Sequence, residues 1–342
     1  MVTRKDIKKL FATLSANEQT MLLDDLLQEH ELKGTILESA YEQVAVERSK
    51  KPCPHCEGEK VHKRGKQKGV QMYQCNDCKK WYSETTGTPL YDIKLKGKWQ
   101  SYLRCMEQGM PIKKIATELG ISIQTSFDWR HKILSSLDQF VPNQLSGVVE
   151  CDELELTLSN KGEKGLQRKP RKRGSDFLRN QGREEVTTVQ VLTVVSRSGG
   201  KYLKAVESKR LSKDEIAKVL DGKLADGTIL MTDKHPSYKA YAKQNPNLKH
   251  KALLAKDHVD GKDNTVHLQG VNNTHFQLKK FLAPFNGVST KYLQNYLNWY
   301  AYKGEISKTK TTLKQWFIAA LMSDQAYNLF WLFKQNAVII RT

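Results

Sequence analysis

The sequence predicts an α/β domain preceded by two small modules, and three observations support this organisation. Two CxxC pairs lie at 53–56 and 75–78 in a chain of 342 residues. A helical pattern interrupted by Gly follows over 111–134, and from residue 146 onward strand-like and helix-like runs alternate. A chain of this length accommodates two or three domains, and its 39% of hydrophobic residues is enough for their cores.

The chain is strongly basic, which narrows the class of partner. Its 56 Lys and Arg residues against 37 Asp and Glu give a net charge of +19. Such an excess favours a polyanion, with nucleic acid first and a membrane surface a distant second. The N-terminal run MVTRKDIKKLF lacks the apolar core of a signal peptide, and no stretch reaches about 18 uninterrupted apolar residues. We therefore expect a cytoplasmic protein without membrane association.

The two ends of the chain are predicted to be helical and carry no recognisable chemistry. Residues 1–50 are rich in Leu, Glu, Lys and Ala at helical spacing, and 306–342 form a second helical segment. The run KTKTTLK at 308–314 either contacts DNA or is simply solvated. The sequence does not decide between these two interpretations.

Residues 51–92 have the layout of a zinc ribbon. The pairs CPHC and CNDC flank a basic hairpin-like segment, HKRGKQKGVQMYQ. Each pair forms a tight knuckle that presents two thiolates, so the two knuckles close one tetrahedral site. Because four thiolates leave no open position, the site is predicted to be structural and to stabilise a unit too small for its own core. The predicted ligands of one zinc ion are Cys53, Cys56, Cys75 and Cys78.

Residues 93–140 are predicted to form a helix-turn-helix DNA-binding region. In PIKKIATELGISIQTSFDWRHKIL, Gly120 ends one amphipathic helix and a second begins after it. The second helix carries Arg130 and Lys132, which we expect to contact DNA. A helical hairpin buried in a core is the alternative.

Residues 146–305 are predicted to be an α/β domain with three consecutive strands first. The strands are expected at 147–156, 186–195, 201–206, 228–232 and 250–254, and the helices at 212–220, 238–244 and 271–304. Ser212 and Glu215 form a capping box at the start of the first helix. Three strands followed by helix, strand, helix, strand and helix match the order of a ribonuclease-H-like domain.

Two acids occupy suggestive positions in this domain. Asp152 lies within the first strand and Asp233 at the carboxyl end of the fourth. Functional groups gather at strand ends in open α/β sheets, and two carboxylates brought together can hold divalent cations for phosphoryl transfer. Alternation along the strand puts Glu150 on the face of Asp152, and Glu153 on the other face. The plainer alternative is that each Asp caps a helix or forms a turn.

A basic segment between these acids is predicted to grip phosphate. KGEKGLQRKPRKRG, at 161–174, carries seven basic residues and one acid. Its position just after the first candidate metal ligand favours a DNA contact over a solvated loop. The predicted DNA-binding residues are Lys169, Arg171, Lys172 and Arg173.

The order of these motifs resembles the bacterial insertion-sequence transposases of the insertion-sequence 1595 family, the ISXO-type group with a zinc ribbon. ECDE, KG…RKPRKRG, MTDKHPSY and VNNTHFQLKKF follow the ribbon and the helix-turn-helix in the order typical of that family. The resemblance covers roughly 50–305. It implies a catalytic core that cuts and joins double-stranded DNA with two Mg²⁺ ions. It also implies that the N-terminal modules recognise the terminal inverted repeats of the element.

The resemblance also implies a third metal ligand. One branch of this family uses Asn, followed seven residues later by Lys, in place of the more usual Glu. Asn272 and Lys279 stand at this spacing, which is two helical turns, and His275 also matches the pattern. The implied set is Asp152, Asp233 and Asn272 as ligands, with Lys279 positioning phosphate and His275 near the site. Asn273 and Glu305 are the competing third ligands, and a helix N-cap is the plainer role of Asn272.

We therefore expect a DDE-type DNA transposase, acting as a homodimer or larger assembly when ends are paired. The alternative is a zinc-ribbon, helix-turn-helix DNA-binding regulator with an inactive core, which the lack of a third carboxylate favours. A nuclease that cuts without joining is a third possibility. The sequence does not predict the repeat sequence, the target, the fate of the second strand or the need for accessory proteins.

Overall fold

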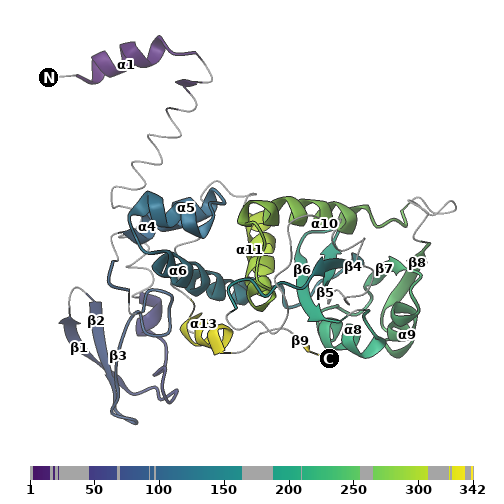
Figure 1. Cartoon of the computed structure of the whole chain (residues 1–342). Coiled ribbons are helices and arrows are strands. Elements are labelled where there is room, and N and C mark those ends of the chain that lie inside the picture. Colours follow the sequence, from purple (N-terminus) through teal and green to yellow (C-terminus); the bar gives the residue numbers. More distant parts are fainter. Residues whose placement is uncertain are drawn as a thin grey trace.

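The computed structural model describes most of the chain and gives the layout of the predicted modules. The residues described are 3–15, 18–19, 22, 46–67, 70–91, 93–95, 98–163, 188–208, 210–254, 265–306, 323, 326–335 and 340–341. Figure 1 shows a small three-stranded sheet, a helical unit and a larger six-stranded sheet with helices, in chain order. A short helix, α1 (Arg4–Ala12), lies away from these parts.

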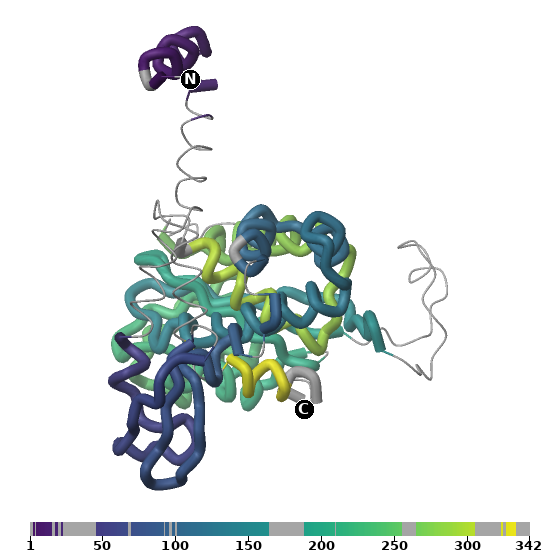
Figure 2. Tube along the Cα trace, turned by 90° about the vertical axis from the view of Figure 1, so that its left-hand side faces the viewer, coloured from purple at the N-terminus to yellow at the C-terminus, as the bar shows by residue number. Residues whose placement is uncertain are grey.

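The small sheet corresponds to the predicted ribbon. Its strands are β1 (Val61–Gln67), β2 (Val70–Cys75) and β3 (Trp81–Ser83), which pair antiparallel in that order. Side chains of β1 after Val61 are exposed, whereas β2 carries the buried Tyr73 and Cys75. Figure 2 shows this sheet as a separate dark-blue lobe that projects from the body of the molecule.

The helical unit consists of α4 (Trp99–Glu107), α5 (Ile112–Leu119), α6 (Ile123–Ser135) and the short 3₁₀ helix η2 (Ser136–Phe140). Gly120 ends α5 in the left-handed conformation, with φ of 56°, which glycine adopts without strain. Ser122 then caps α6 by accepting a hydrogen bond from the backbone N–H of Thr125 at 2.9 Å. Two helices joined by a glycine-containing turn therefore lie where the helix-turn-helix was predicted.

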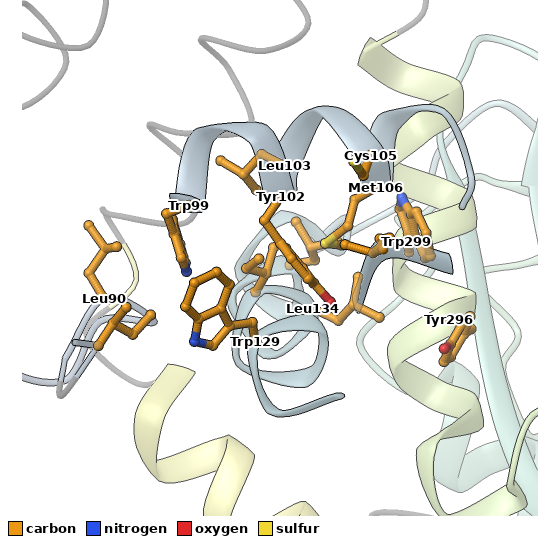
Figure 3. Packing of buried hydrophobic residues seen from close by; sticks show 14 of the residues in the cluster. Leu90, Trp99, Tyr102, Leu103, Cys105, Met106, Trp129, Leu134, Tyr296 and Trp299 are labelled. Carbon is orange, nitrogen blue, oxygen red and sulfur yellow. The ribbon is translucent and has the colours of Figure 1, made fainter. Parts of the chain in front are cut away.

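One hydrophobic core joins this helical unit to the larger domain. Trp99, Tyr102 and Trp129 are buried together with Tyr296 and Trp299, and Figure 3 shows their rings converging. The last two belong to a helix far along the chain, α11 (Leu293–Ile306). Tyr296 and Trp299 thus form a core face of α11, which makes the helical unit continuous with the α/β domain.

The larger sheet contains the five predicted strands and one further strand, β9, in the order β8-β7-β4-β5-β6-β9. Their bounds are β4 (Val148–Thr157), β5 (Thr188–Ser196), β6 (Lys201–Glu207), β7 (Ile229–Asp233), β8 (Lys249–Leu253) and β9 (Ile340–Arg341). The first three pair antiparallel, while β7 and β8 run parallel to β4. All five predicted strands are present in the predicted order along the chain, whereas β9 lies in the segment 306–342 that was predicted to be helical.

Helices cover both faces of this sheet. On one face, α8 (Lys213–Leu220) and α9 (Pro236–Gln244) pack on the core formed with Val149, Cys151 and Val194. On the other, α10 (Gln269–Leu282) and α11 pack on Leu154 and Val191. The predicted capping box at the start of α8 is present.

The predicted helical region 271–304 is in fact two helices. Two 3₁₀ turns separate them, η3 (Ala283–Phe285) and η4 (Thr290–Tyr292). Pro284 disfavours continuation of α10, and Asn286 reverses the chain in the left-handed conformation at φ 51°. The turn directs α11 toward the helical unit.

The described part of the C-terminal segment also packs on the helical unit. Helix α13 (Ala326–Gln335) contacts α6, and the backbone N–H of Tyr327 donates to the Gly87 carbonyl at 3.0 Å. Within the described residues, no helix is long and apolar enough to cross a membrane.

Candidate active site

Asp152 and Asp233 are neighbours on adjacent parallel strands. Glu150 of β4 pairs with Met231 of β7, and Asp152 and Asp233 each stand two residues further along, close enough for the charge of Asp233 to raise the pKa of Asp152. Met231 contacts Val271 of α10 in one core cluster, so the face that carries both carboxylates is the one beneath α10. The structure therefore brings together two acids that are far apart in sequence.

The environment of Asp152 makes its ionised form costly. Burial, together with the nearby charges of Glu153 and Asp233, raises the pKa of Asp152 to about 7. No Lys or Arg forms an ion pair with Asp152 among the described residues. Two neighbouring carboxylates without a cationic partner are a donor set that suits a divalent metal ion.

His275 of α10 lies beside Asp152. Its Nδ1 lies 4.0 Å from Asp152 Oδ2, and the residue is 8% exposed. Burial, with a smaller effect of Lys279, lowers the pKa of His275 to about 4, so the imidazole is neutral at pH 7. Its Nε2 is buried and has no hydrogen-bond partner within the described residues. A neutral imidazole with an unused ring nitrogen is available to a ligand or to a metal ion.

Asn272 and Lys279 lie on the solvent side of α10, next to His275. Both are exposed and stand two turns apart. Asn272 is not the N-cap of α10, because the cap is Leu268, whose carbonyl accepts the Asn272 N–H at 3.0 Å. The alternative capping role of Asn272 was therefore wrong. Lys279 lines a cavity of about 280 Å³ beside Thr157, where β4 ends.

Glu305, the competing carboxylate, belongs to the far end of α11. The neighbouring Lys303 donates from Nζ to the Glu107 carbonyl of α4 at 3.1 Å. Leu297, at the other end of α11, packs on the sheet. The last turn of α11 thus lies against the helical unit, and the side chain of Glu305 lies outside the described part of the structure.

The two glutamates beside Asp152 have different surroundings, as alternation predicts. Burial raises the pKa of Glu153, which lies near Tyr238 of α9. Glu150 is 1% exposed on the α10 face, where its Oε1 lies 2.8 Å from Arg197 Nε. Sequence reasoning missed this ion pair, because nothing in the chain near Arg197 signals a partner 47 residues away.

The four predicted zinc ligands lie together in the ribbon. Their sulfur atoms are all within 4.8 Å of one another, with Cys53 and Cys78 3.7 Å apart and Cys56 and Cys75 3.6 Å apart. A tetrahedral site with Zn–S distances of about 2.3 Å requires sulfur separations of about 3.8 Å. Backbone N–H groups, chiefly that of Cys78, lower the pKa of Cys75 to about 7, which favours the thiolate. Geometry and chemistry therefore fit a zinc site with four cysteine ligands.

Arg130 and Lys132 are buried, which corrects the prediction that they contact DNA. Arg130 is 0% exposed, donates to the Met110 carbonyl and lies 5.0 Å from the Trp299 ring centre. Lys132 is 9% exposed and donates to the Tyr91 carbonyl at 3.2 Å. Both side chains bond to backbone carbonyl oxygens inside the core, because α11 and α13 pack around the C-terminal half of α6.

In the predicted helix-turn-helix region, the turn between α5 and α6 and the first turn of α6 are exposed. Ser122, Ile123 and Gln124 are exposed there, and Lys113 and Lys114 are exposed on α5. Sequence reasoning overlooked these residues in favour of the basic ones further along α6. The rule that N-terminal residues of the second helix meet the bases would have found them.

Four predicted DNA-binding residues of the basic segment lie outside the described residues, as does the whole of 164–187. They are Lys169, Arg171, Lys172 and Arg173. Lys161, at the start of the segment, donates from Nζ to the carbonyl oxygens of Asn286 and Gly287 at 3.0 and 2.8 Å. Its charge therefore stabilises the turn between α10 and α11.

The fold and the site define a ribonuclease-H-like domain with an acidic centre on two adjacent parallel strands. Residues 144–305 match the family described as the ISXO2-like transposase domain. This segment of the chain is therefore a transposase domain of the insertion-sequence 1595 type, as the resemblance predicted.

The comparisons include one curated relative and several solved structures. An uncharacterized protein in transposable element ISH50 of Halobacterium salinarum is 24% identical over 74% of this chain and 85% of its own. The Mos1 transposase paired-end complex with the left transposon end is 10% identical, covering 70% of this chain and 79% of the other, with a TM-score of 0.30. The mariner Mos1 paired-end complex with Mg is 12% identical over the same shares, with a TM-score of 0.29. The fold assignment rests on the strand order and not on these low TM-scores.

Proposed function

We propose that this protein is a DNA transposase that cuts the ends of its element and joins them to target DNA with a divalent metal ion. The observation that supports it is the juxtaposition of Asp152 and Asp233 under α10, inside the segment that matches the transposase family. Two carboxylates with no basic partner among the described residues have a clear use as hard-metal ligands.

The residues of this site would have different roles in phosphoryl transfer. When bound, Mg²⁺ would activate the attacking oxygen and stabilise the leaving one. Asp152 and Asp233 would hold it, and Asn272 would add an uncharged amide oxygen from α10. His275 would offer its unused Nε2 to phosphate or water, and Lys279 would attract phosphate from the rim. Because Asn brings no charge, metal binding should be weak until DNA phosphate contributes.

The N-terminal modules would bind the ends of the element. The zinc ribbon presents exposed His62, Lys63 and Arg64 on β1. The helix-turn-helix would present Gln124 at the start of α6 and Lys113 on the exposed face of α5. A basic strand and a polar helix end suit phosphate and groove contacts respectively. Paired ends require at least two copies, so we expect a homodimer or larger assembly on DNA.

The test is metal-dependent cleavage of DNA that carries the element's own ends. The intact chain should nick these ends with Mg²⁺, whereas Asp152→Ala and Asp233→Ala should bind the ends and leave them uncut. Glu118→Ala, which removes an exposed carboxylate on α5, is the matched control and should cut normally. Equal cutting by Asp152→Ala and the control would refute the proposed site.

The competing proposal is a DNA-binding regulator with an inactive core, and the exposed amide of Asn272 in place of a carboxylate favours it. Under this proposal the intact chain binds ends but never cuts them with Mg²⁺ or Mn²⁺. A nuclease would cut a labelled end without joining it to a second duplex. The same assay therefore separates all three functions.

A further inference from the structure

Glu150 is an almost fully buried carboxylate whose two oxygens have different partners. It is 1% exposed. Oε2 accepts the backbone N–H of Val271 at 2.9 Å, and Oε1 lies 2.8 Å from Arg197 Nε and 3.5 Å from His267 Nδ1. A buried carboxylate with these contacts has its charge and its hydrogen-bonding capacity satisfied by protein.

The contact with Val271 replaces a missing helix cap. Leu268, the N-cap of α10, has no side chain that can accept a hydrogen bond. The first N–H groups of a helix need acceptors, and a negative charge there is favoured by the helix dipole. Glu150, which is 121 residues earlier in the chain, supplies both. The start of α10 is thus attached to the strand that carries Asp152.

Arg197 extends this attachment to the segment that leads into α10. It follows β5 and donates to the carbonyl oxygens of Thr265 and His267 at 2.7 and 3.1 Å. Its backbone N–H donates to the Val148 carbonyl of β4 at 2.9 Å. One guanidinium therefore connects β4, the Glu150 carboxylate and the approach to α10.

Gly270 shows how closely the helix approaches this carboxylate. A Cβ built on Gly270 would lie 2.8 Å from Glu150 Oε2 and 3.2 Å from its Cδ. A flexible side chain could move away from such a contact, but Glu150 is held at both oxygens. Any side chain at position 270 must therefore displace the start of α10 or break a contact of Glu150.

We infer that Glu150 is a positioning residue that, with Arg197, fixes the N-terminus of α10 and thereby keeps His275 beside Asp152. The covalent path is short on both sides: Glu150 lies two residues before Asp152, and its partner Val271 lies next to Asn272. The contact between Glu150 and Val271 thus sets the distance between β4, which carries Asp152, and the start of α10, which carries Asn272. The inference rests on the proposed function for its consequence in catalysis, and on the contacts themselves for its effect on metal binding.

The experiment introduces one methyl group at this contact and leaves every charge in place. Gly270→Ala should weaken binding of Mn²⁺ to the full-length protein by about tenfold, as loss of support around metal ligands does. Gly304→Ala, in α11, is the matched control because a Cβ there meets nothing within 4 Å, and it should leave Mn²⁺ affinity unchanged. Mn²⁺ binding is measured without DNA by electron paramagnetic resonance.

Two further variants separate positioning from a ligand role. In the Glu150→Asp background the carboxylate is one methylene shorter, so Gly270→Ala should cost less than in the intact chain. Arg197→Lys changes no residue of α10 and no candidate ligand, and it should also lower Mn²⁺ affinity. It replaces Gly270→Ala as the test variant if Gly270→Ala fails to fold. Binding of DNA ends should be retained by all folded variants.

Equal Mn²⁺ affinity of Gly270→Ala and Gly304→Ala would overturn the inference, as would equal costs of Gly270→Ala in both backgrounds. If the intact protein binds Mn²⁺ but never cuts DNA, the proposed function fails while the positioning role of Glu150 is still decided by these affinities.

Discussion

Asp152 and His275 meet between β4 and α10, with His275 Nδ1 4.0 Å from Asp152 Oδ2. The raised pKa of Asp152 and the lowered pKa of His275 both disfavour charge at this contact. The pair is therefore not a salt bridge at neutral pH. It is a site of low charge that gains from binding a cation, and its consequences can be measured.

The first prediction concerns stability and pH. The folded Asp152 keeps its proton up to about pH 7, whereas the unfolded chain releases it near its ordinary pKa of about 3.9. This group therefore stabilises the fold at low pH, and the contribution is lost as pH rises toward 7. In the intact chain the free energy of unfolding should fall by on the order of 2 kcal/mol between about pH 5.5 and pH 8 because of this group. Asp152→Asn should not show this decrease.

The measurement is denaturant unfolding of both chains without added divalent metal and without chelator, so that the ribbon keeps its own metal. The difference between Asp152→Asn and the intact chain should grow with pH. A difference that stays constant from pH 5.5 to pH 8 contradicts the raised pKa, while Glu118→Gln provides the baseline for an exposed acid.

A second prediction concerns the ribbon. The purified chain should contain one zinc ion, and Cys56→Ser should lose it because three thiolates hold zinc more weakly than four. Cys105→Ser, which alters a buried cysteine outside the cluster, should retain it. Metal analysis checks both, and limited proteolysis should cut the ribbon of Cys56→Ser faster. Equal zinc in the two variants would exclude the four-cysteine site.

The third prediction separates stability from DNA binding in the helix-turn-helix. Arg130→Ala should destabilise the fold by about 3 kcal/mol, because it removes a buried cation that contacts Trp299. Lys113→Ala, on the exposed face of α5, should leave stability unchanged and reduce the salt dependence of DNA binding by about one counterion. Thermal unfolding and binding titrations at several salt concentrations test the two. A stable Arg130→Ala variant with weakened DNA binding would restore the original assignment.

A fourth prediction concerns the uncharged third ligand. Asn272→Asp adds a negative charge beside Asp152 and Asp233, so it should raise Mg²⁺ affinity roughly tenfold in the absence of DNA. Asn273→Asp, one position along the exposed surface of α10, is its control and should change affinity little. Calorimetric titration of Mg²⁺ into the DNA-free protein measures the effect. If Asn273→Asp gives the larger gain, Asn273 is the ligand.

The strands could be predicted from sequence because local signals determine them. The strand that ends at Asp233 is a short apolar run, the strand around Asp152 mixes Val, Cys and Leu with acids, and the Ser212–Glu215 capping box marks a helix start. The break at Pro284 and Asn286 carries equally local signals, which the prediction of one helical region overlooked.

The features that the sequence predicted wrongly or did not predict depend on contacts between distant segments. Arg130 and Lys132 lie where a recognition helix is often basic, but the packing of α11 and α13 around α6 encloses them. The role of Glu150 depends on Val271, 121 residues away, and so has no local signature. Periodicity shows which residues share a helix face but not which neighbour covers that face.

The most direct test of the central claim is joining of a labelled element end to a second DNA duplex in the presence of Mg²⁺. The intact chain should produce the joined product, and Asp152→Ala should bind the end and produce none. Joining by Asp152→Ala at the rate of the intact chain would contradict the assignment of the active site. An intact chain that binds ends without cutting or joining them would contradict the transposase function.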